Sequence, residues 1–263
     1  MRVSKLFLIL SIAVNCAIAQ KLPNKQSAGI TAPSNVKIDG NIAEWGNLQA
    51  YNHATDVAYT LANDAQNLYL IIKADNPAIV NKIINGGVTL AINKAAKQNG
   101  GDITITYPVF EKGIKPVLNI NKALLEKGGS DVTTVSDADV LQSNDSFAAK
   151  SKLIMVTGMV DIDTLLSVYN DKGIKIAARF DNHMAYNCEL SVPISKLSLT
   201  SDKFAYHIIL NGESPLIKGV STGKATATPA NEIVEAKVAA EQAQLGRNTA
   251  PTDFWGEYTL SKK

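Results

Sequence analysis

The chain has 263 residues, of which 46% are hydrophobic and 19% charged, and this length allows a sizeable buried core. Its formal net charge of +2 falls to zero without residues 1–19, which hold Arg2 and Lys5 and no acidic residue. A neutral chain lacks the basic footprint that nucleic acids and anionic membrane surfaces require, so we expect neither as a partner.

The N-terminus is predicted to be an export signal. Arg2 and Lys5 form a positive start, residues 6–17 form a short apolar run, and Ala17-Ile-Ala19 fits a small-x-small cleavage site. We therefore expect a mature chain from Gln20 that is secreted, or held in the periplasm or cell envelope. No later segment has the ~18 apolar residues of a membrane-spanning helix, so no transmembrane segment is expected in the mature chain.

The two cysteines raise separate questions. Cys16 is the candidate for a lipid anchor, but Asn15 precedes it where Gly, Ala or Ser is usual, so a free mature chain is favoured. Cys188 then remains alone, which excludes an intramolecular disulfide. It lies in an alternating apolar run, and this predicts a small buried thiol rather than a nucleophile. His183 is near Cys188 in sequence, but this closeness alone does not establish a pair.

Short strands dominate the pattern beyond a flexible, polar leader at residues 20–34. The predicted strands are rich in Val, Ile, Thr and Tyr and separated by Gly, Asn and Asp. This pattern predicts a mostly β protein, an antiparallel sandwich of immunoglobulin-like or jelly-roll-like type with short helical insertions. The predicted strands are 36–38, 57–61, 68–74, 88–92, 103–108, 153–157, 174–178, 185–192, 204–210 and 255–260.

Other stretches read as insertions into a single domain over residues 35–263. Helices are predicted at 119–128, 160–169 and 231–245, the last with Asn231 as N-cap and Gly246 as stop. Residues 77–85 read as helical or irregular, and residues 128–151 as loops around weak strands. The insertions lie near 111–170 and 212–250.

Four blocks in this order give the chain a resemblance to family 9 carbohydrate-binding modules. They are Ile38-Asp-Gly40 with Glu44-Trp45, Asn63 to Lys73, Gly87 to Ile92, and Tyr186 to Ile194 followed by Phe254 to Leu260. The resemblance implies a β-sandwich and non-catalytic sugar binding. It also implies two aromatic residues that clamp a terminal sugar, but the corresponding stretches, 77–85 and 246–253, hold no aromatic residue. Asn93 stands where the family has an acidic residue.

Aromatic residues are the candidates for a rebuilt sugar site. Tyr107, Tyr169 and Tyr186 are the candidates for a ligand-binding face. Trp45 and Trp255 are expected to pack in or at the rim of the sandwich, as parts of the structural motif that includes Asp39 and Gly40.

Calcium is the one cofactor that the sequence suggests, as an alternative to none. Asp131, Asp137, Asp139 and Asp145 offer oxygen ligands in one polar segment. They lack the spacing of a known calcium loop, so a solvated acidic loop is favoured. Asp39 is expected to cap its own turn.

No catalytic motif is present, and we expect a binding protein rather than an enzyme. The leading hypothesis is a non-catalytic domain that binds a glycan. The alternative is a structural or protein-interaction domain of the cell envelope, with residues 231–245 as the contact surface. A carboxylate-based glycoside hydrolase ranks third.

Overall fold

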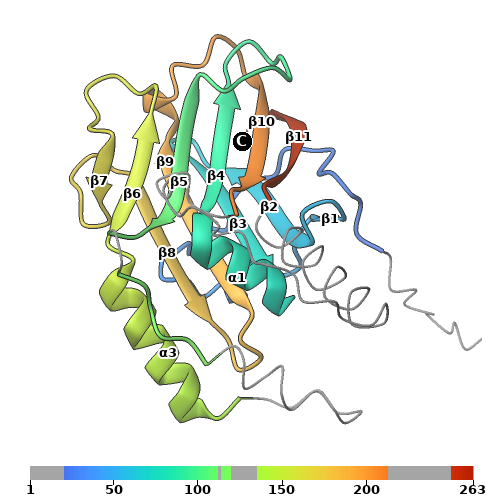
Figure 1. The fold of residues 1–263 in the computed structure, drawn as a ribbon. Helices are drawn as coiled ribbons and strands as arrows, with labels where there is room; N and C mark the ends of the chain where they lie inside the picture. Colours follow the sequence, from blue (N-terminus) through green and yellow to red (C-terminus); the bar gives the residue numbers. More distant parts are fainter. Residues whose placement is uncertain (1–20, 112–113, 120–134, 213–249, 263) are drawn as a thin grey trace, which may run out of the picture.

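The fold is an antiparallel β-sandwich, seen in a computed structural model that describes residues 21–111, 114–119, 135–212 and 250–262 (Figure 1). One sheet has five strands in the order β1-β2-β3-β9-β8, and the other has six in the order β11-β10-β4-β5-β6-β7. The mostly β sandwich predicted from the sequence is confirmed. The five-stranded sheet contains β1 (Ala50–Asn52), β2 (Val57–Asn63), β3 (Asn67–Ala74), β9 (Tyr186–Pro193) and β8 (Lys175–Phe180). The six-stranded sheet contains β11 (Thr252–Thr259), β10 (Lys203–Leu210), β4 (Val88–Asn93), β5 (Ile103–Val109), β6 (Leu153–Thr157) and β7 (Leu165–Ser167).

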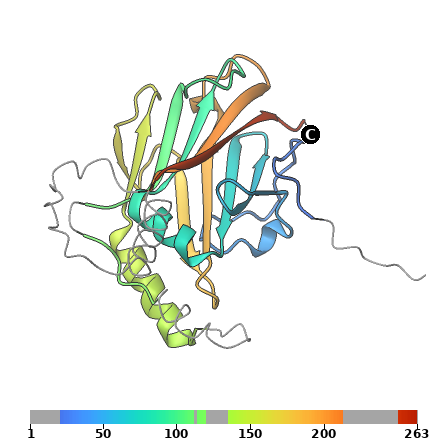
Figure 2. The ribbon, with the colours of Figure 1, turned by 45° about the vertical axis from the view of Figure 1, so that its right-hand side comes forward.

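The core lies between the two sheets (Figure 2), where apolar side chains alternate inward along each strand. Aromatic residues join the sheets at one side. The ring of Tyr59 on β2 lies 5.0 Å from that of Phe254 on β11, and its hydroxyl lies 2.8 Å from that of Tyr206 on β10. The edge strands β1 and β11 therefore lie on the same side of the sandwich.

Helix α1 (Pro77–Gly86) closes one end of the sandwich. Asn76 caps it by accepting a 3.0 Å hydrogen bond from the Ala78 N–H, and Pro77 occupies the first helical turn, where no N–H is needed. Val80 and Ile83 point into the core. The stretch that the sequence left as helical or irregular is thus a regular amphipathic helix.

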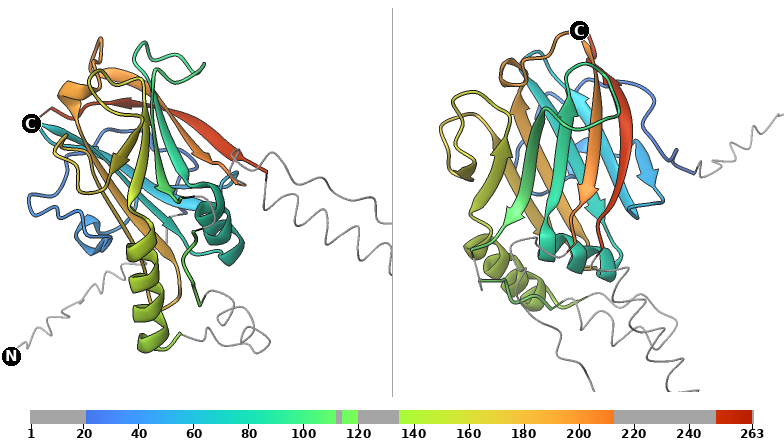
Figure 3. Two further views of the ribbon diagram at one scale, coloured as in Figure 1. Left: turned by 60° about the vertical axis from the view of Figure 1, so that its left-hand side comes forward. Right: turned by 45° about the horizontal axis from the view of Figure 1, so that its top comes forward.

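Helix α3 (Asp137–Lys150) lies at the same end (Figure 3), where loops around weak strands were predicted. That prediction was wrong because the helix is mostly polar and Phe147 is its one fully buried apolar side chain. Phe147 is 1% exposed and meets the rings of Tyr107, Phe180 and Tyr186 edge-on. Ser136 caps the helix by accepting from the Asp139 N–H.

Two further predicted elements differ from the structure. Residues 160–169 do not form a helix, because Leu165 and Leu166 alternate as in a strand, with Leu165 53% exposed and Leu166 buried in the core. Together β6 and β7 extend the six-stranded sheet within the region predicted as an insertion. Residues 36–38 form no strand, since they cross over the outer face of the five-stranded sheet instead of pairing with it.

The leader over residues 21–34 packs against the sandwich and corrects the prediction of a flexible segment. The side-chain amide of Gln26 donates to the Leu61 carbonyl at 2.7 Å and accepts from the Leu61 N–H at 2.8 Å. Further along, Ala32 donates its N–H to the carbonyl of Asn63, and the Asn63 N–H donates to the carbonyl of Ile30. The leader thus satisfies the backbone of β2 where β1 no longer pairs with it.

Several predictions fall outside the described residues: the signal peptide, most of the helix at 119–128, the helix at 231–245 and most of the insertion at 212–250. Among the helices of the described ranges, none is long and apolar enough to span a bilayer.

Candidate functional site

The Asp39-Gly40 turn and Trp45 are held by one buried carboxylate, that of Glu189 on β9. Its Oε2 accepts from the N–H groups of Asp39 and Gly40 at 3.0 and 2.8 Å, and its Oε1 accepts from the Trp45 indole N–H at 2.8 Å. Burial raises the pKa of Glu189, and these three hydrogen bonds oppose the shift. The indole also packs against Tyr69, with ring centroids 5.5 Å apart. Trp45 is therefore a packing residue, as expected.

Only glycine fits at position 40, because a side chain there lacks space and the backbone is in the left-handed region. Its φ is +82°, and a Cβ there would lie 2.8 Å from the backbone carbon of Ala178 on β8. Asp39 accepts from the Asn41 N–H at 2.8 Å, so it caps its own turn as expected. The motif at residues 38–45 thus fastens a loop to the five-stranded sheet.

The three tyrosines predicted as a ligand-binding face do not come together. Tyr107 and Tyr186 are 4% and 0% exposed, so neither ring offers a surface for stacking. Tyr169 is 76% exposed and lies next to β7, where the Lys152 ammonium is 5.0 Å from its ring centre. Binding by these residues was an expectation, and the geometry does not support a shared face. The sequence pattern around each of the three tyrosines did not show whether its ring would point into the core or toward solvent.

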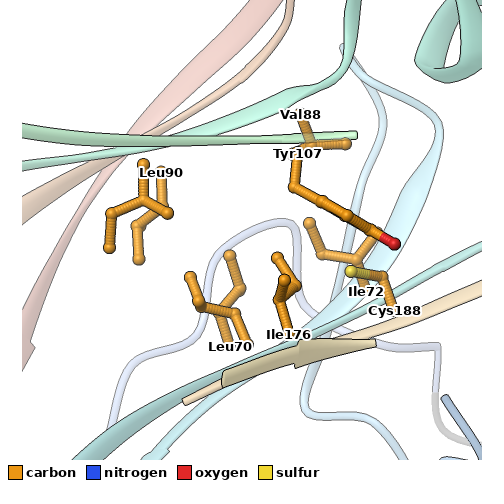
Figure 4. A pocket seen from close by; sticks show the side chains of 9 residues that line it. Leu70, Ile72, Val88, Leu90, Tyr107, Ile176 and Cys188 are labelled. Carbon is orange, nitrogen blue, oxygen red and sulfur yellow. The ribbon is translucent and has the colours of Figure 1, made fainter. Parts of the chain in front are cut away.

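An interior cavity of ≈ 20 Å³ lies between the sheets beside Tyr107 and Cys188 (Figure 4). Seven aliphatic residues complete its lining. The volume is about that of one water molecule, so the cavity does not hold an organic ligand. Burial raises the pKa of Cys188 to about 12, which confirms the prediction of a buried, unreactive thiol.

The acidic residues predicted as calcium ligands have other surroundings. Asp137 and Asp139 lie in the first turn of α3, where carboxylates favour the positive end of the helix dipole. Asp139 also accepts from the Ser136 hydroxyl at 2.9 Å. Asp145 lies two turns further along, and Asp131 is outside the described residues. Within the described ranges, no group of three or more potential ligands is present.

A partly exposed aromatic pair lies instead on the outer face of the six-stranded sheet. Trp255 on β11 stands directly opposite His207 on β10 in the strand register. Their rings are 4.1 Å apart and inclined by only 13°, a parallel stack. Phe254, Gly256 and Tyr258 point into the core, so Trp255 belongs to the opposite face of the strand.

Charged side chains flank this pair along β11. Asp253 Oδ2 lies 2.6 Å from His207 Nε2, and Glu257 Oε2 lies 2.6 Å from Lys203 Nζ. The Asp253 and Glu257 side chains are 49% and 44% exposed. No hydrogen bond to the other oxygen of either carboxylate, or from the indole N–H, is found among the residues that the structure describes.

This surface can stack on an apolar ligand face and accept hydrogen bonds beside it. We find no nucleophile hydrogen-bonded to His207 within the described parts of the chain. The sequence did carry a signal for the site. In residues 252–259 Phe254 and Tyr258 fall on even positions, which places Trp255 with Asp253 and Glu257 on the other face of the strand.

Comparison with known proteins yields little beyond the fold. No protein-family profile matches the sequence, and neither does any curated protein sequence. A solved structure described as a family 9 carbohydrate binding module from Caldicellulosiruptor kristjanssonii, in complex with glucose, is similar over 89% of this chain and 95% of that chain. The identity is 10% and the TM-score 0.37, so this is a weak fold resemblance and carries no argument about the site.

Proposed function

We propose that the protein is an exported, non-catalytic domain that binds carbohydrate against the indole of Trp255. The observation that carries the proposal is the Trp255–His207 stack on the outer sheet face. An aromatic ring held rigid by a stacked neighbour offers a flat apolar surface at low entropic cost, as sugar C–H groups require. The flanking carboxylate oxygens supply acceptors for hydroxyl groups.

The test is a glycan array probed with the full chain and with Trp255→Ala, followed by titration of any bound oligosaccharide. Tyr169→Ala is the matched control, because it removes another partly polar, exposed ring from a different part of the sheet. We expect binding by the natural chain and the control, and a loss of at least about tenfold, or 1.4 kcal/mol, in Trp255→Ala.

Two results would contradict the proposal. One is an array on which the natural chain binds no glycan. The other is binding that survives Trp255→Ala unchanged, which would place the ligand elsewhere. The chain has only two tryptophans, and Trp45 is engaged with Glu189. Fluorescence quenching in Trp45→Phe therefore reports on Trp255 alone.

A further inference from the structure

The stacking geometry fixes which face of Trp255 is available to a ligand. Neighbouring strands lie about 4.8 Å apart, and the two ring centres, on directly paired residues, are 4.1 Å apart. The stack therefore runs along the direction from strand to strand. His207 covers the indole face toward β10, and the opposite face points past β11, which is the outermost strand of its sheet among the residues that the structure describes.

A ligand on that face lies along the sheet edge. Asp253 and Glu257 are each two residues from Trp255 on the same side of β11, which puts each about 7 Å along the strand from the indole. A pyranose ring stacked on Trp255 therefore has a carboxylate at each end. A sugar chain that continues beyond one ring runs parallel to β11 and passes one of them.

Charge then selects between sugars. Glu257 is balanced by Lys203, while Asp253 pairs with His207, an imidazole that carries a charge only when protonated. Among the described residues that flank the indole on β10 and β11, there are thus two carboxylates and one permanent cation. The hydroxyl groups of a neutral sugar can donate hydrogen bonds to these carboxylates. A carboxylate on the sugar is repelled by their negative charge.

We propose that the Trp255 edge binds neutral pyranosides lengthwise along β11 and rejects sugars that carry carboxylates. This inference rests on the proposed carbohydrate-binding function and adds the ligand class and the residues that set it. Glu257 is the residue to change in the test, because its charge and that of its partner Lys203 can each be removed while Asp253, which holds His207, stays in place.

The experiment compares two matched probes on the full chain by calorimetry: a β-1,4-linked glucose tetrasaccharide and the same tetrasaccharide oxidised to carboxylates at C6. We expect the neutral probe to bind at least about tenfold more tightly. Glu257→Gln should narrow that ratio, because it removes a negative charge and keeps a carbonyl oxygen. Lys203→Gln should widen it, because it removes the cation beside Glu257. Added salt should narrow the ratio in the natural chain.

The outcomes separate this inference from the proposed function. One outcome is that Trp255→Ala loses all binding, while Glu257→Gln and Lys203→Gln both leave the ratio of the two probe affinities unchanged. This outcome would overturn the inference about charge and would still support the proposed function, sugar binding at Trp255. Equal or tighter binding of the oxidised probe would overturn it as well. If neither probe nor any other glycan binds the natural chain, both proposals fail.

Discussion

The indole N–H of Trp45 donates a 2.8 Å hydrogen bond to Oε1 of Glu189, a residue 144 positions away in the sequence. The same carboxylate accepts from the backbone of Asp39 and Gly40. One buried side chain of the central sheet thus holds both ends of the loop that begins the sandwich. The loop's attachment can be weakened by changing a single functional group.

Glu189→Gln should lower the free energy of unfolding at neutral pH by about 1–3 kcal/mol, because an amide NH₂ must then face either Trp45 or the two backbone donors. The pH dependence has a definite sign. The native pKa of Glu189 is raised, so its contribution to stability is greatest below the unfolded pKa of about 4.3 and is lost as the pH rises through the native pKa. Urea unfolding of both chains from acid to neutral pH should give slopes that differ by this contribution, because the other carboxyl groups titrate in both chains. Identical slopes would contradict the shift.

The buried tyrosine pair predicts an order of stabilities. The Tyr59 hydroxyl contacts that of Tyr206 and also accepts from the Gln26 N–H at 2.9 Å. Tyr59→Phe leaves both of those groups without this partner, whereas Tyr206→Phe leaves Tyr59 bonded to Gln26. Each orphaned group costs about 1–3 kcal/mol, so urea unfolding should find Tyr59→Phe the less stable variant. The reverse order would show that the Gln26 contact contributes nothing.

Cys188 should resist alkylation in the folded protein. Burial raises its pKa to about 12, so almost no thiolate forms at about pH 8. In a chain with Cys16→Ser, iodoacetamide should label Cys188 only as fast as the protein opens. The same chain in denaturant is the control and should be labelled at once. Rapid labelling without denaturant would contradict the placement of Cys188 in the core.

Asn144 on α3 should stabilise the free edge of β8. Its amide donates to the Phe180 carbonyl at 3.0 Å and accepts from the Phe180 N–H at 2.8 Å. We expect Asn144→Ala to cost about 1–3 kcal/mol in thermal or urea unfolding, although alanine is the better helix former. Leu141→Ala on the same helix is the control, because Leu141 is 62% exposed and should tolerate the change.

The sequence predicted the strands well, since β2, β3, β4, β5, β6, β9 and β10 each contain a run of apolar and β-branched residues that alternation reveals. The prediction failed for elements whose conformation depends on tertiary contacts. Phe147 is the fully buried apolar side chain of helix α3, with Val140 partly buried beside the core, and a polar stretch with so few apolar residues carries no helical stripe. Apolar and polar residues alternate at 36–38 as in a strand, but these residues pack on the outer face of the five-stranded sheet and do not pair with its edge.

The candidate site was harder to predict than the fold. Tyr107, Tyr169 and Tyr186 were chosen as free aromatics, and two of them prove to be core residues because their strands are covered on the inner face. Trp255 was expected to pack in the core or at the rim of the sandwich, and the alternation of its buried neighbours Phe254 and Tyr258 places it on the outer face of β11. What the sequence could not show is the pairing with His207, 48 residues away, since the register between two strands is set by the whole sheet.

The two amides that contact backbone, Gln26 at Leu61 and Asn144 at Phe180, lie at opposite edges of the five-stranded sheet. A side-chain amide has the same donor and acceptor as a peptide group, so each takes a position that a strand from another molecule would need. At these two positions the five-stranded sheet is thereby blocked from pairing with a further strand. At the β11 edge of the six-stranded sheet, a bound sugar would compete with such pairing.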